Sequence, residues 1–578
     1  MKKKKQKAQL TPMVAFRKAL KDDKWGEAMK MAFSLFNKEE KNKVLYALGE
    51  KLLSIAGDNN KLKTAFYFMD LYSVQGPKEG KFIWLLNIAT SYYDSKKYPK
   101  LLLLTKTILD IMNKLPEEQR PKRNLQTDMW KLYALALFSL GFIEDAVNAF
   151  NETWQKNDNK DARYRDFGNV LLAAQCTNFA DEDLFAMHCS YNSLFKDIEP
   201  YQYDMAAYKS ELQQRIADGG KIKIGYISPD FHDHPVLNFC CGLFRFYDRS
   251  RFEVHCYSTQ AKQDYVTEWV KEQTYDYVDV SDLTFEQAAQ KIHDDHIDIL
   301  IDLAGHTGNT GLPALAYKPA PIQMSGIGYL SSTGLKAVDY IITDKIIDPP
   351  ENNGQYLTEK PFYLTSHFCY QYFKGEMPAS MGAPCLKNGY VTFGSFNKYQ
   401  KFTNEMLGAW KRIMDEVPNS RLFLKGMTCE DPDFMQMLKE RFSSLGFDLS
   451  RVDVEGYDGK YMERYLDIDI ALDTYPYTGG TTTCDAIYMG VPVVSRYGNR
   501  RNTRFSLGIL QTMGLKSLTA DNVEDYVTYA VGLAQNTELL DSLHKKLRQM
   551  FLKSPMGTPE AYTRETEKKF LEILGLNV

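Results

Sequence analysis

One change of pattern divides this sequence and constrains its fold. Up to about residue 215, apolar residues recur with helical spacing, and β-branched runs and turn clusters are few. After Asp218-Gly219-Gly220, short strand-like runs alternate with helical stretches instead. Such alternation is typical of parallel, doubly wound sheets. We therefore predict an all-α module over 1–215, followed by α/β structure.

The α/β part contains two successive sets of strands, separated by a stretch of linker composition at 377–384. This predicts one Rossmann-like domain over 221–376 and another over 385–578. In open parallel sheets, ligands bind beyond the carboxyl ends of the strands, so the loops there should carry the function. The strand-like runs lie at 221–227, 252–257, 277–280 and 297–303, and then at 390–394, 421–424, 469–472 and 491–494.

The all-α module contains one helical hairpin with a recognisable spacing. Between Trp130 and Phe150, large residues alternate with Ala134, Gly141 and Ala146 as in a tetratricopeptide hairpin, where alanines let helices approach and glycine permits the turn. A looser copy lies between residues 85 and 101. The alternative is plain helical packing. Helical repeats offer concave surfaces, so we expect this module to bind a protein partner.

Composition excludes several classes of protein. Hydrophobic residues make up 44% of the 578 residues, which rules out dominant disorder. The formal net charge of -3 gives no global attraction to nucleic acid. No segment approaches the ~18 consecutive apolar residues of a membrane span. The nine cysteines form no CxxC pair, which is typical of reduced thiols and predicts a cytoplasmic protein.

The loop that begins at Asp473 is the best candidate ligand site. It follows a strand and leads through Gly479, Gly480, Thr481 and Thr482 into an amphipathic helix. Two glycines let a ligand approach the backbone, and the first N–H groups of the helix, together with the threonine hydroxyls, suit a phosphate. A threonine-rich helix cap is the alternative. Asp485, one turn into the helix, either accepts from a ribose hydroxyl or complements the helix dipole.

Three further strand-end loops carry chemically useful residues. Lys401, in the loop that holds Asn397, could neutralise a diphosphate, although taken alone it reads as a surface lysine. His232 and His234 could act in acid–base chemistry or bind a hydroxylated ligand; a metal is the alternative, but no third ligand is evident. The third loop set places His306, Gly328 and Tyr329 where they would line a sugar or acceptor cleft.

Taken in order, these loops resemble those of the O-linked N-acetylglucosamine transferase family, which includes the plant SPINDLY protein O-fucosyltransferase. The resemblance implies a GT-B-type fold in which the 221–376 domain is acceptor-side and the 385–578 domain binds the nucleotide sugar. It also implies inverting glycosyl transfer without a metal or other cofactor. The matching segments are 224–231, 234–235, 302–307, 318–323, 328–329, 339–344, 396–397, 401, 471–474, 480–482 and 489–492.

The resemblance also assigns roles to individual residues. It implies that Lys401 contacts the diphosphate and stabilises the leaving group, and that His234 lies beside the donor sugar as one candidate base. Asp485 would bind the ribose. Lysine and a helix N-terminus can together supply the charge compensation that a departing diphosphate needs. The nucleotide-sugar set is Asn397, Lys401, Arg464, Gly480, Thr481, Thr482 and Asp485.

The sequence departs from the animal enzymes of that family at positions that bear on the donor. Lys398 replaces a glutamine, Gly480 replaces a histidine, and the segment 455–461 lacks the animal pattern. UDP-N-acetylglucosamine is the first choice of donor, with GDP-fucose and UDP-glucose as alternatives. The expected activity is transfer to Ser or Thr of a protein. A non-catalytic adaptor and transfer to a small molecule or glycan are the other hypotheses.

Overall fold

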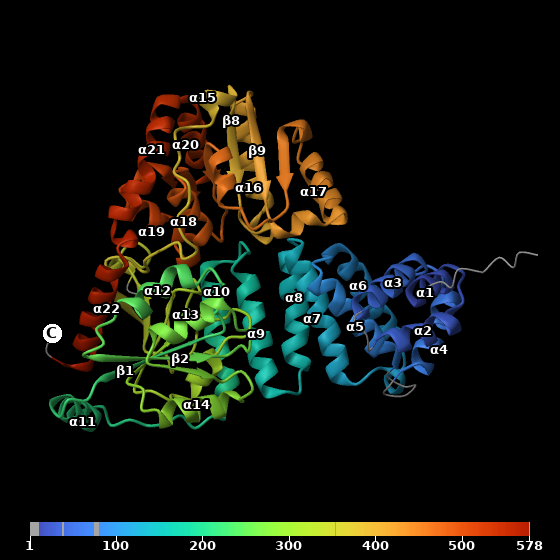
Figure 1. The fold of residues 1–578 in the computed structure, drawn as a ribbon, viewed down its shortest axis with the longest axis horizontal. Helices are drawn as coiled ribbons and strands as arrows, with labels where there is room; N and C mark the ends of the chain where they lie inside the picture. The colour runs from blue at the N-terminus through green and yellow to red at the C-terminus, as the bar shows by residue number, and fades with distance from the viewer. Residues whose placement is uncertain (1–10, 37–39, 74–79, 353, 577–578) are drawn as a thin grey trace, which may run out of the picture. The chain divides into compact units, whose positions relative to one another are not determined.

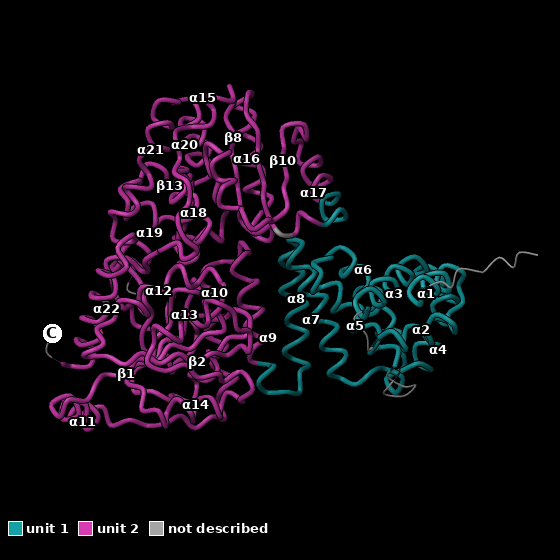
Figure 2. Tube along the Cα trace, viewed as in Figure 1, with its two compact units in different colours: residues 1–163, 431–437 teal, residues 164–430, 438–578 magenta. Residues whose placement is uncertain are grey.

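A computed structural model describes residues 11–36, 40–73, 80–352 and 354–576. The chain forms two compact units, one of residues 1–163 with 431–437 and the other of residues 164–430 with 438–578 (Figure 2). The division at residue 163 differs from the module boundary that we predicted at 215. It leaves the two α/β domains together in the second unit.

The first unit is made of helices, which in Figure 1 run from blue to cyan. The predicted hairpin is present: Gly141 turns the chain at a φ of 80°, and Ala134 and Ala146 are fully buried between the paired helices α7 and α8. Small side chains at the crossing let these helices pack closely. The helices are α1 (Pro12–Lys21), α2 (Trp25–Phe36), α3 (Lys41–Ser54), α4 (Asn59–Leu71), α5 (Gly80–Asp94), α6 (Tyr98–Lys114), α7 (Arg123–Ser139) and α8 (Ile143–Lys156).

The helices that follow mostly belong to the second unit. They are α9 (Lys160–Ala174), whose first turn lies in the first unit, α10 (Asp181–Ser190) and α11 (Met205–Ala217). Asn502 donates to the carbonyl of Gln175 at 2.9 Å, and Tyr208 donates to Asp298 at 2.6 Å. Helical periodicity alone could not distinguish these helices from those of the first unit.

The second unit contains two parallel sheets, as predicted. The first has the order β3-β2-β1-β4-β5-β6-β7 and interleaves with α12 (Leu237–Arg245), α13 (Tyr265–Gln273) and α14 (Phe285–Asp294). Four strands match the predicted runs, and β5 to β7 were not predicted. The strands are β1 (Ile222–Ser228), β2 (Phe252–Ser258), β3 (Asp276–Asp279), β4 (Ile299–Asp302), β5 (Ile322–Ser325), β6 (Tyr340–Thr343) and β7 (Lys360–Tyr363).

The second sheet has the order β10-β9-β8-β11-β12-β13. Its strands are β8 (Val391–Ser395), β9 (Ser420–Lys425), β10 (Val452–Glu455), β11 (Ile470–Leu472), β12 (Val493–Arg496) and β13 (Thr519–Ala520). Its helices are α15 (Cys385–Asn388), α16 (Asn404–Glu416), α17 (Pro432–Ser444), α18 (Thr481–Tyr488), α19 (Phe505–Thr512), α20 (Val523–Gln535) and α21 (Thr537–Lys553). The part of α17 up to residue 437 belongs to the first unit.

The last helix, α22 (Pro559–Leu574), packs against α12 of the first sheet (Figure 1). Glu567 on α22 accepts from the N–H of Asp248 at 2.6 Å. The segment 385–578 therefore does not form a domain confined to the second sheet, because its final helix returns to the first.

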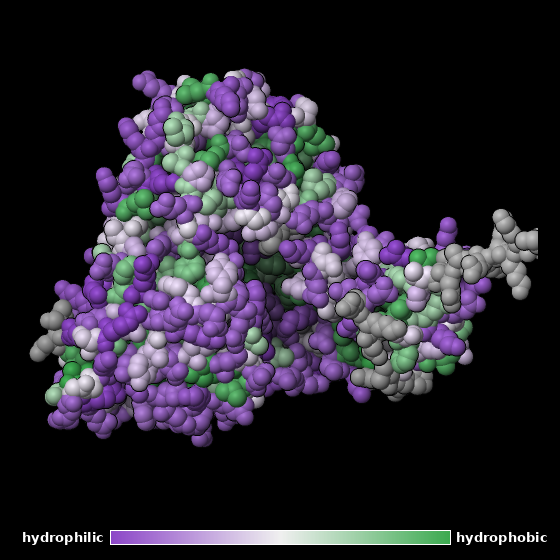
Figure 3. Space-filling view, viewed as in Figure 1, coloured by the Kyte–Doolittle hydropathy of each residue, from purple (hydrophilic) through white to green (hydrophobic). Residues whose placement is uncertain are grey.

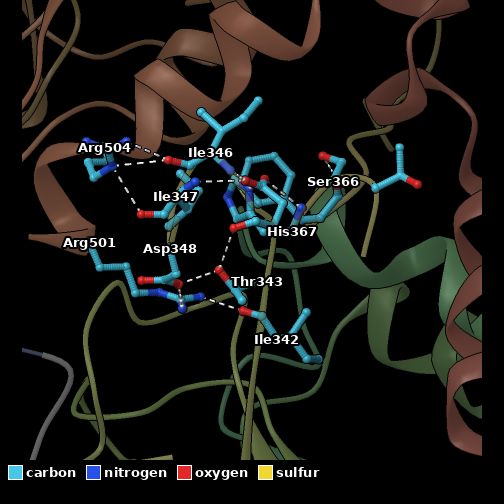
Figure 4. Close-up of polar contacts among 12 residues, drawn as sticks. Ile342, Thr343, Ile346, Ile347, Asp348, Ser366, His367, Arg501 and Arg504 are labelled. Carbon is cyan, nitrogen blue, oxygen red and sulfur yellow. Dashed lines mark hydrogen bonds and ion pairs between the residues drawn. The ribbon is translucent and has the colours of Figure 1, made fainter. Parts of the chain in front are cut away.

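Arginines that precede α19 tie the two sheets together (Figure 4). Arg501 pairs with Asp348 at 2.6 Å and donates to the carbonyl of Ile342, while Arg504 donates to the carbonyl of Ile346 at 2.8 Å. Asp348 also accepts from Thr343, at the end of β6. These contacts hold the loop after β6 against the second sheet.

The part of the chain that the structure describes has no helix long and apolar enough to cross a membrane. The face shown in Figure 3 is mostly hydrophilic on both units.

Candidate functional site

The loop that follows β11 is built around the buried side chain of Asp473. One carboxylate oxygen accepts from the N–H groups of Thr474 and Gly479, each at 2.8 Å, and the other accepts from Ser495 at 2.7 Å. Asn397, from the loop after β8, donates to the same carboxylate at 3.4 Å. Asp473 thereby fixes the glycine turn and joins it to the neighbouring strand-end loop.

The glycine turn places the start of α18 at the end of the sheet. Gly480 is the N-cap, and the N–H of Cys484 is the first that bonds back to its carbonyl, at 3.0 Å. Helix geometry leaves the preceding N–H groups, those of Thr481 to Thr483, for another acceptor. Thr482 lies in the same place, since its hydroxyl donates to Asn397 at 3.1 Å. This arrangement suits an anion.

Lys401 adds a positive charge to this arrangement. Its ammonium donates to the carbonyl of Thr478 at 3.0 Å and lies 4.2 Å from the centre of the Tyr477 ring. The surrounding protein desolvates the group and lowers the pKa of Lys401 to about 8, although the charge of Asp473 acts in the opposite direction. The side chain is nevertheless partly exposed to solvent. A desolvated yet accessible cation interacts strongly with a phosphate.

Asp485 lies one turn into α18 and is buried. Tyr370 donates to one of its oxygens, and Tyr461 donates to the other at 3.1 Å. Burial raises the pKa of Asp485 to about 7, even though both hydroxyls stabilise the carboxylate. Both tyrosines were missed by sequence reasoning, because nothing in the local pattern shows that these segments converge on Asp485.

Arg464 stands close to the same helix but is already paired. It donates to Glu455 at 2.8 Å and to Asp467, and its guanidinium lies 5.0 Å from the Phe423 ring. The adjacent Tyr465 donates to the carbonyl of Thr482 at 3.2 Å. The structure therefore brings Arg464 beside the site with its charge compensated.

His234, in the loop after β1, is partly exposed, and its Nδ1 lies 3.5 Å from the carboxylate of Asp230. Burial lowers the pKa of His234 to about 4, and nearby cations, including Lys398, act in the same direction. Lys398 is itself exposed. Its charge acts on His234 as well as on Lys401 of its own loop, so the loops after β1 and β8 lie within electrostatic range of one another.

His306 and Tyr329 differ from our expectation that they line a cleft, because both side chains are buried. His306 pairs through Nε2 with the carbonyl of Thr333 at 2.8 Å, and Tyr329 bonds to His188 of α10 at 2.8 Å. Gly328 lies so close to β4 that an added Cβ would stand 2.1 Å from the Leu303 carbonyl oxygen. These residues hold the strand-end loops together.

Two doubly wound parallel sheets, preceded by helical hairpins and carrying an anion-suited helix start at a strand end, are the arrangement of a GT-B glycosyltransferase. A family model described as Glycosyl transferase family 41 matches residues 193–377 and 379–566. The chain therefore belongs to glycosyl transferase family 41.

Curated relatives agree with this assignment. The chain is 34% identical over 414 residues to a Petunia hybrida protein named as a probable UDP-N-acetylglucosamine–peptide N-acetylglucosaminyltransferase SPINDLY, covering 70% of this chain and 43% of that protein. It is 26% identical over 407 residues to the Arabidopsis thaliana protein SEC, described by the same enzyme name, covering 68% and 41%. The chain spans less than half the length of these relatives.

A solved structure supports the fold. A mutant of the Thermobaculum terrenum O-GlcNAc transferase superposes with a TM-score of 0.74 at 22% identity, covering 98% of each chain. The α/β fold with a helical N-terminal region, predicted from the sequence, is thus confirmed.

Proposed function

We propose that this protein is an inverting glycosyltransferase that moves a sugar to Ser or Thr hydroxyls of a protein acceptor. Membership of family 41 supports the reaction class. The observation that carries the proposal is the convergence of Lys401, Asn397 and the start of α18 on one glycine turn. This is the chemistry that a departing nucleoside diphosphate requires.

In this mechanism the two strand-end loops of the second sheet hold the donor. The N–H groups and hydroxyls of Thr481 and Thr482 bind phosphate oxygens, and Lys401 compensates the charge that grows as the glycosidic bond breaks. Asp485 binds the ribose. To do so it exchanges the hydrogen bond from Tyr370 or Tyr461 for one from a ribose hydroxyl. His234, across from these groups, accepts the proton of the acceptor hydroxyl.

UDP-N-acetylglucosamine is the donor that we propose, supported by the enzyme names of the relatives. GDP-fucose and UDP-glucose are the alternatives, because the segment that contains Tyr461 departs from the animal pattern. We place the protein in the cytoplasm and assign acceptor binding to the helical first unit. A catalytically inactive adaptor is the competing function.

The deciding experiment incubates the full chain with each sugar nucleotide and host lysate, followed by intact-mass and peptide mass spectrometry. We expect the mass of one sugar on Ser or Thr with a single donor. No transfer with any donor would favour the adaptor. The same assay in excess EDTA should retain full activity, because Lys401 replaces the metal, and a requirement for Mg²⁺ or Mn²⁺ would contradict that role.

A further inference from the structure

The mechanism above leaves Asp230 without a role, although it lies against His234. Asp230 Oδ1 is 3.5 Å from His234 Nδ1, and the side chains are 12% and 39% exposed. The N–H of Val236 points at the same Nδ1 from 3.4 Å. In the described part of the chain, His234 Nε2 has no hydrogen-bond partner. The imidazole thus presents Nδ1 to protein and Nε2 to solvent.

The two partners of Nδ1 require opposite forms of the ring. A backbone N–H needs an unprotonated Nδ1, whereas a carboxylate needs Nδ1–H. Both contacts to Nδ1 are long for hydrogen bonds, but a bond to a charged carboxylate is stronger than one between neutral groups, so an ionised Asp230 should decide the tautomer. With Nδ1–H bound to Asp230, the free lone pair lies on Nε2, the nitrogen that faces solvent.

Charged groups from several elements surround the pair. His232 and Asp233 lie in the same loop, and Lys262, after β2, is 3.2 Å from His232. Asp230 is also affected by the charges of Asp302, at the end of β4, and of Lys398, after β8. The charge of Asp230 in turn acts on Cys240 of α12. The charge of Lys398 acts on Lys401 as well as on Asp230 and His234. The Asp230–His234 pair therefore lies within electrostatic range of the loop that carries Lys401.

We propose that Asp230 is the positioning residue of His234: its carboxylate accepts the Nδ1–H and directs the Nε2 lone pair at the acceptor hydroxyl. This rests on the proposed function. The hydroxyl oxygen bonds to the anomeric carbon, and the bond from that carbon to the diphosphate oxygen breaks, its electron pair leaving with the diphosphate. The hydroxyl proton moves to Nε2. Asp230 stays ionised and stabilises the imidazolium, as the aspartate does in a Ser-His-Asp triad.

The titration of the pair sets a pH range for this arrangement. Burial, with the negative charge of Asp302, raises the pKa of Asp230 to about 7. The carboxylate that orients His234 therefore forms only as the pH rises through about 7. Activity should rise over that interval, and the rise should disappear when Asp230 cannot ionise.

The first test compares Asp230→Asn with Asp282→Asn. Asp282 is a matched control, because it is an exposed aspartate in the loop after β3 of the same sheet. We expect Asp230→Asn to lower kcat about 10- to 100-fold at pH 8, with the donor KM unchanged and the rise near pH 7 lost. Asp282→Asn should stay within about twofold of the native rate. Similar behaviour of the two variants would overturn the proposal.

Two further measurements separate positioning from folding and from the reaction itself. In a His234→Ala background, Asp230→Asn should have no additional effect, whereas a purely structural role would lower activity in both backgrounds. ¹⁵N NMR of histidine-labelled protein at pH 8, assigned with His234→Gln, should show the Nδ1–H tautomer at His234 and its loss in Asp230→Asn. An Nε2–H tautomer in the native protein would overturn this inference alone, whereas absent sugar transfer would overturn the proposed function.

Discussion

The ammonium of Lys401 donates a 3.0 Å hydrogen bond to the carbonyl oxygen of Thr478. The bond joins the loop after β8 to the loop after β11. Its acceptor, Thr478, lies two positions before Gly480, which is the N-cap of α18. A charge held in place before the reaction needs no reorganisation when a leaving group develops negative charge. The predictions that concern Lys401 follow from this contact.

Lys401→Ala should act mainly on turnover, because the interaction strengthens as the diphosphate departs. We expect kcat to fall roughly 10²–10³-fold. Donor affinity should fall less, since Thr481, Thr482 and the start of α18 remain. Steady-state kinetics with the active donor measures both quantities.

Lys387→Ala is the control for this substitution, because Lys387 is exposed and lies on α15, which precedes β8, whereas Asn397 and Lys401 follow the other end of that strand. Lys398 is unsuitable as a neutral control, because its charge acts on Asp230 and His234. Normal turnover in Lys401→Ala would contradict the assigned role and favour the adaptor hypothesis.

The pH dependence of kcat/KM should report the same lysine. Desolvation lowers the pKa of Lys401 to about 8 in the free protein, so the ammonium is present below this pH and is lost above it. Activity should therefore fall as the pH rises through about 8. Arginine stays charged throughout this range, so Lys401→Arg should lower the rate but flatten the alkaline limb. If the alkaline fall in kcat/KM were unchanged in Lys401→Arg, that fall would be due to the titration of another group.

The strands and their chemically useful loops were predictable because each signal is local. An apolar run that ends in Gly, Thr or His predicts a strand and its loop without knowledge of the neighbouring strands. Because the strands are parallel, their carboxyl ends then lie at one edge of the sheet. The strands β5, β6 and β7 were missed because the described chain has no α-helix between β4 and β7, so the alternation of strands and helices that marks the other strands stops there.

Residues that act through a distant partner could not be predicted in the same way. Tyr370 and Asp485 meet across 115 positions of sequence. From the sequence, Asp473 could be recognised only as an acidic residue at the end of a strand. The return of α22 to the first sheet has no local sequence signal. Likewise, the buried position of His306 depends on α10, which periodicity assigned to the helical module.

Asp473→Ala should destabilise the second unit. The buried carboxylate accepts from Thr474, Gly479 and Ser495, and its removal leaves those donors without an acceptor. We expect a loss of about 3 kcal/mol in the free energy of unfolding, measured by urea denaturation. Donor affinity should also fall, because the glycine turn loses its anchor.

Asp415→Ala provides the comparison for Asp473→Ala. Asp415 forms a helix-surface pair with Lys411 and is 55% exposed. Its loss should cost no more than about 0.5 kcal/mol. If the two substitutions had equal effects, Asp473 would not organise the turn.

Truncation should distinguish the helices by the unit to which they belong. Deletion of residues 1–158 removes the first eight helices and keeps α9 whole, so donor hydrolysis and the melting temperature of the second unit should be largely retained, while transfer to protein falls.

Deletion of residues 1–203 also removes His188, which binds Tyr329, and the backbone carbonyl of Thr177, which accepts from Arg500 at 2.6 Å. Buried polar groups would lose their partners, so hydrolysis should fall and the melting temperature drop. Equal loss of hydrolysis in both truncations would show that the first unit is required for the catalytic fold, and retained hydrolysis in the longer truncation would show that α9 and α10 are dispensable for it.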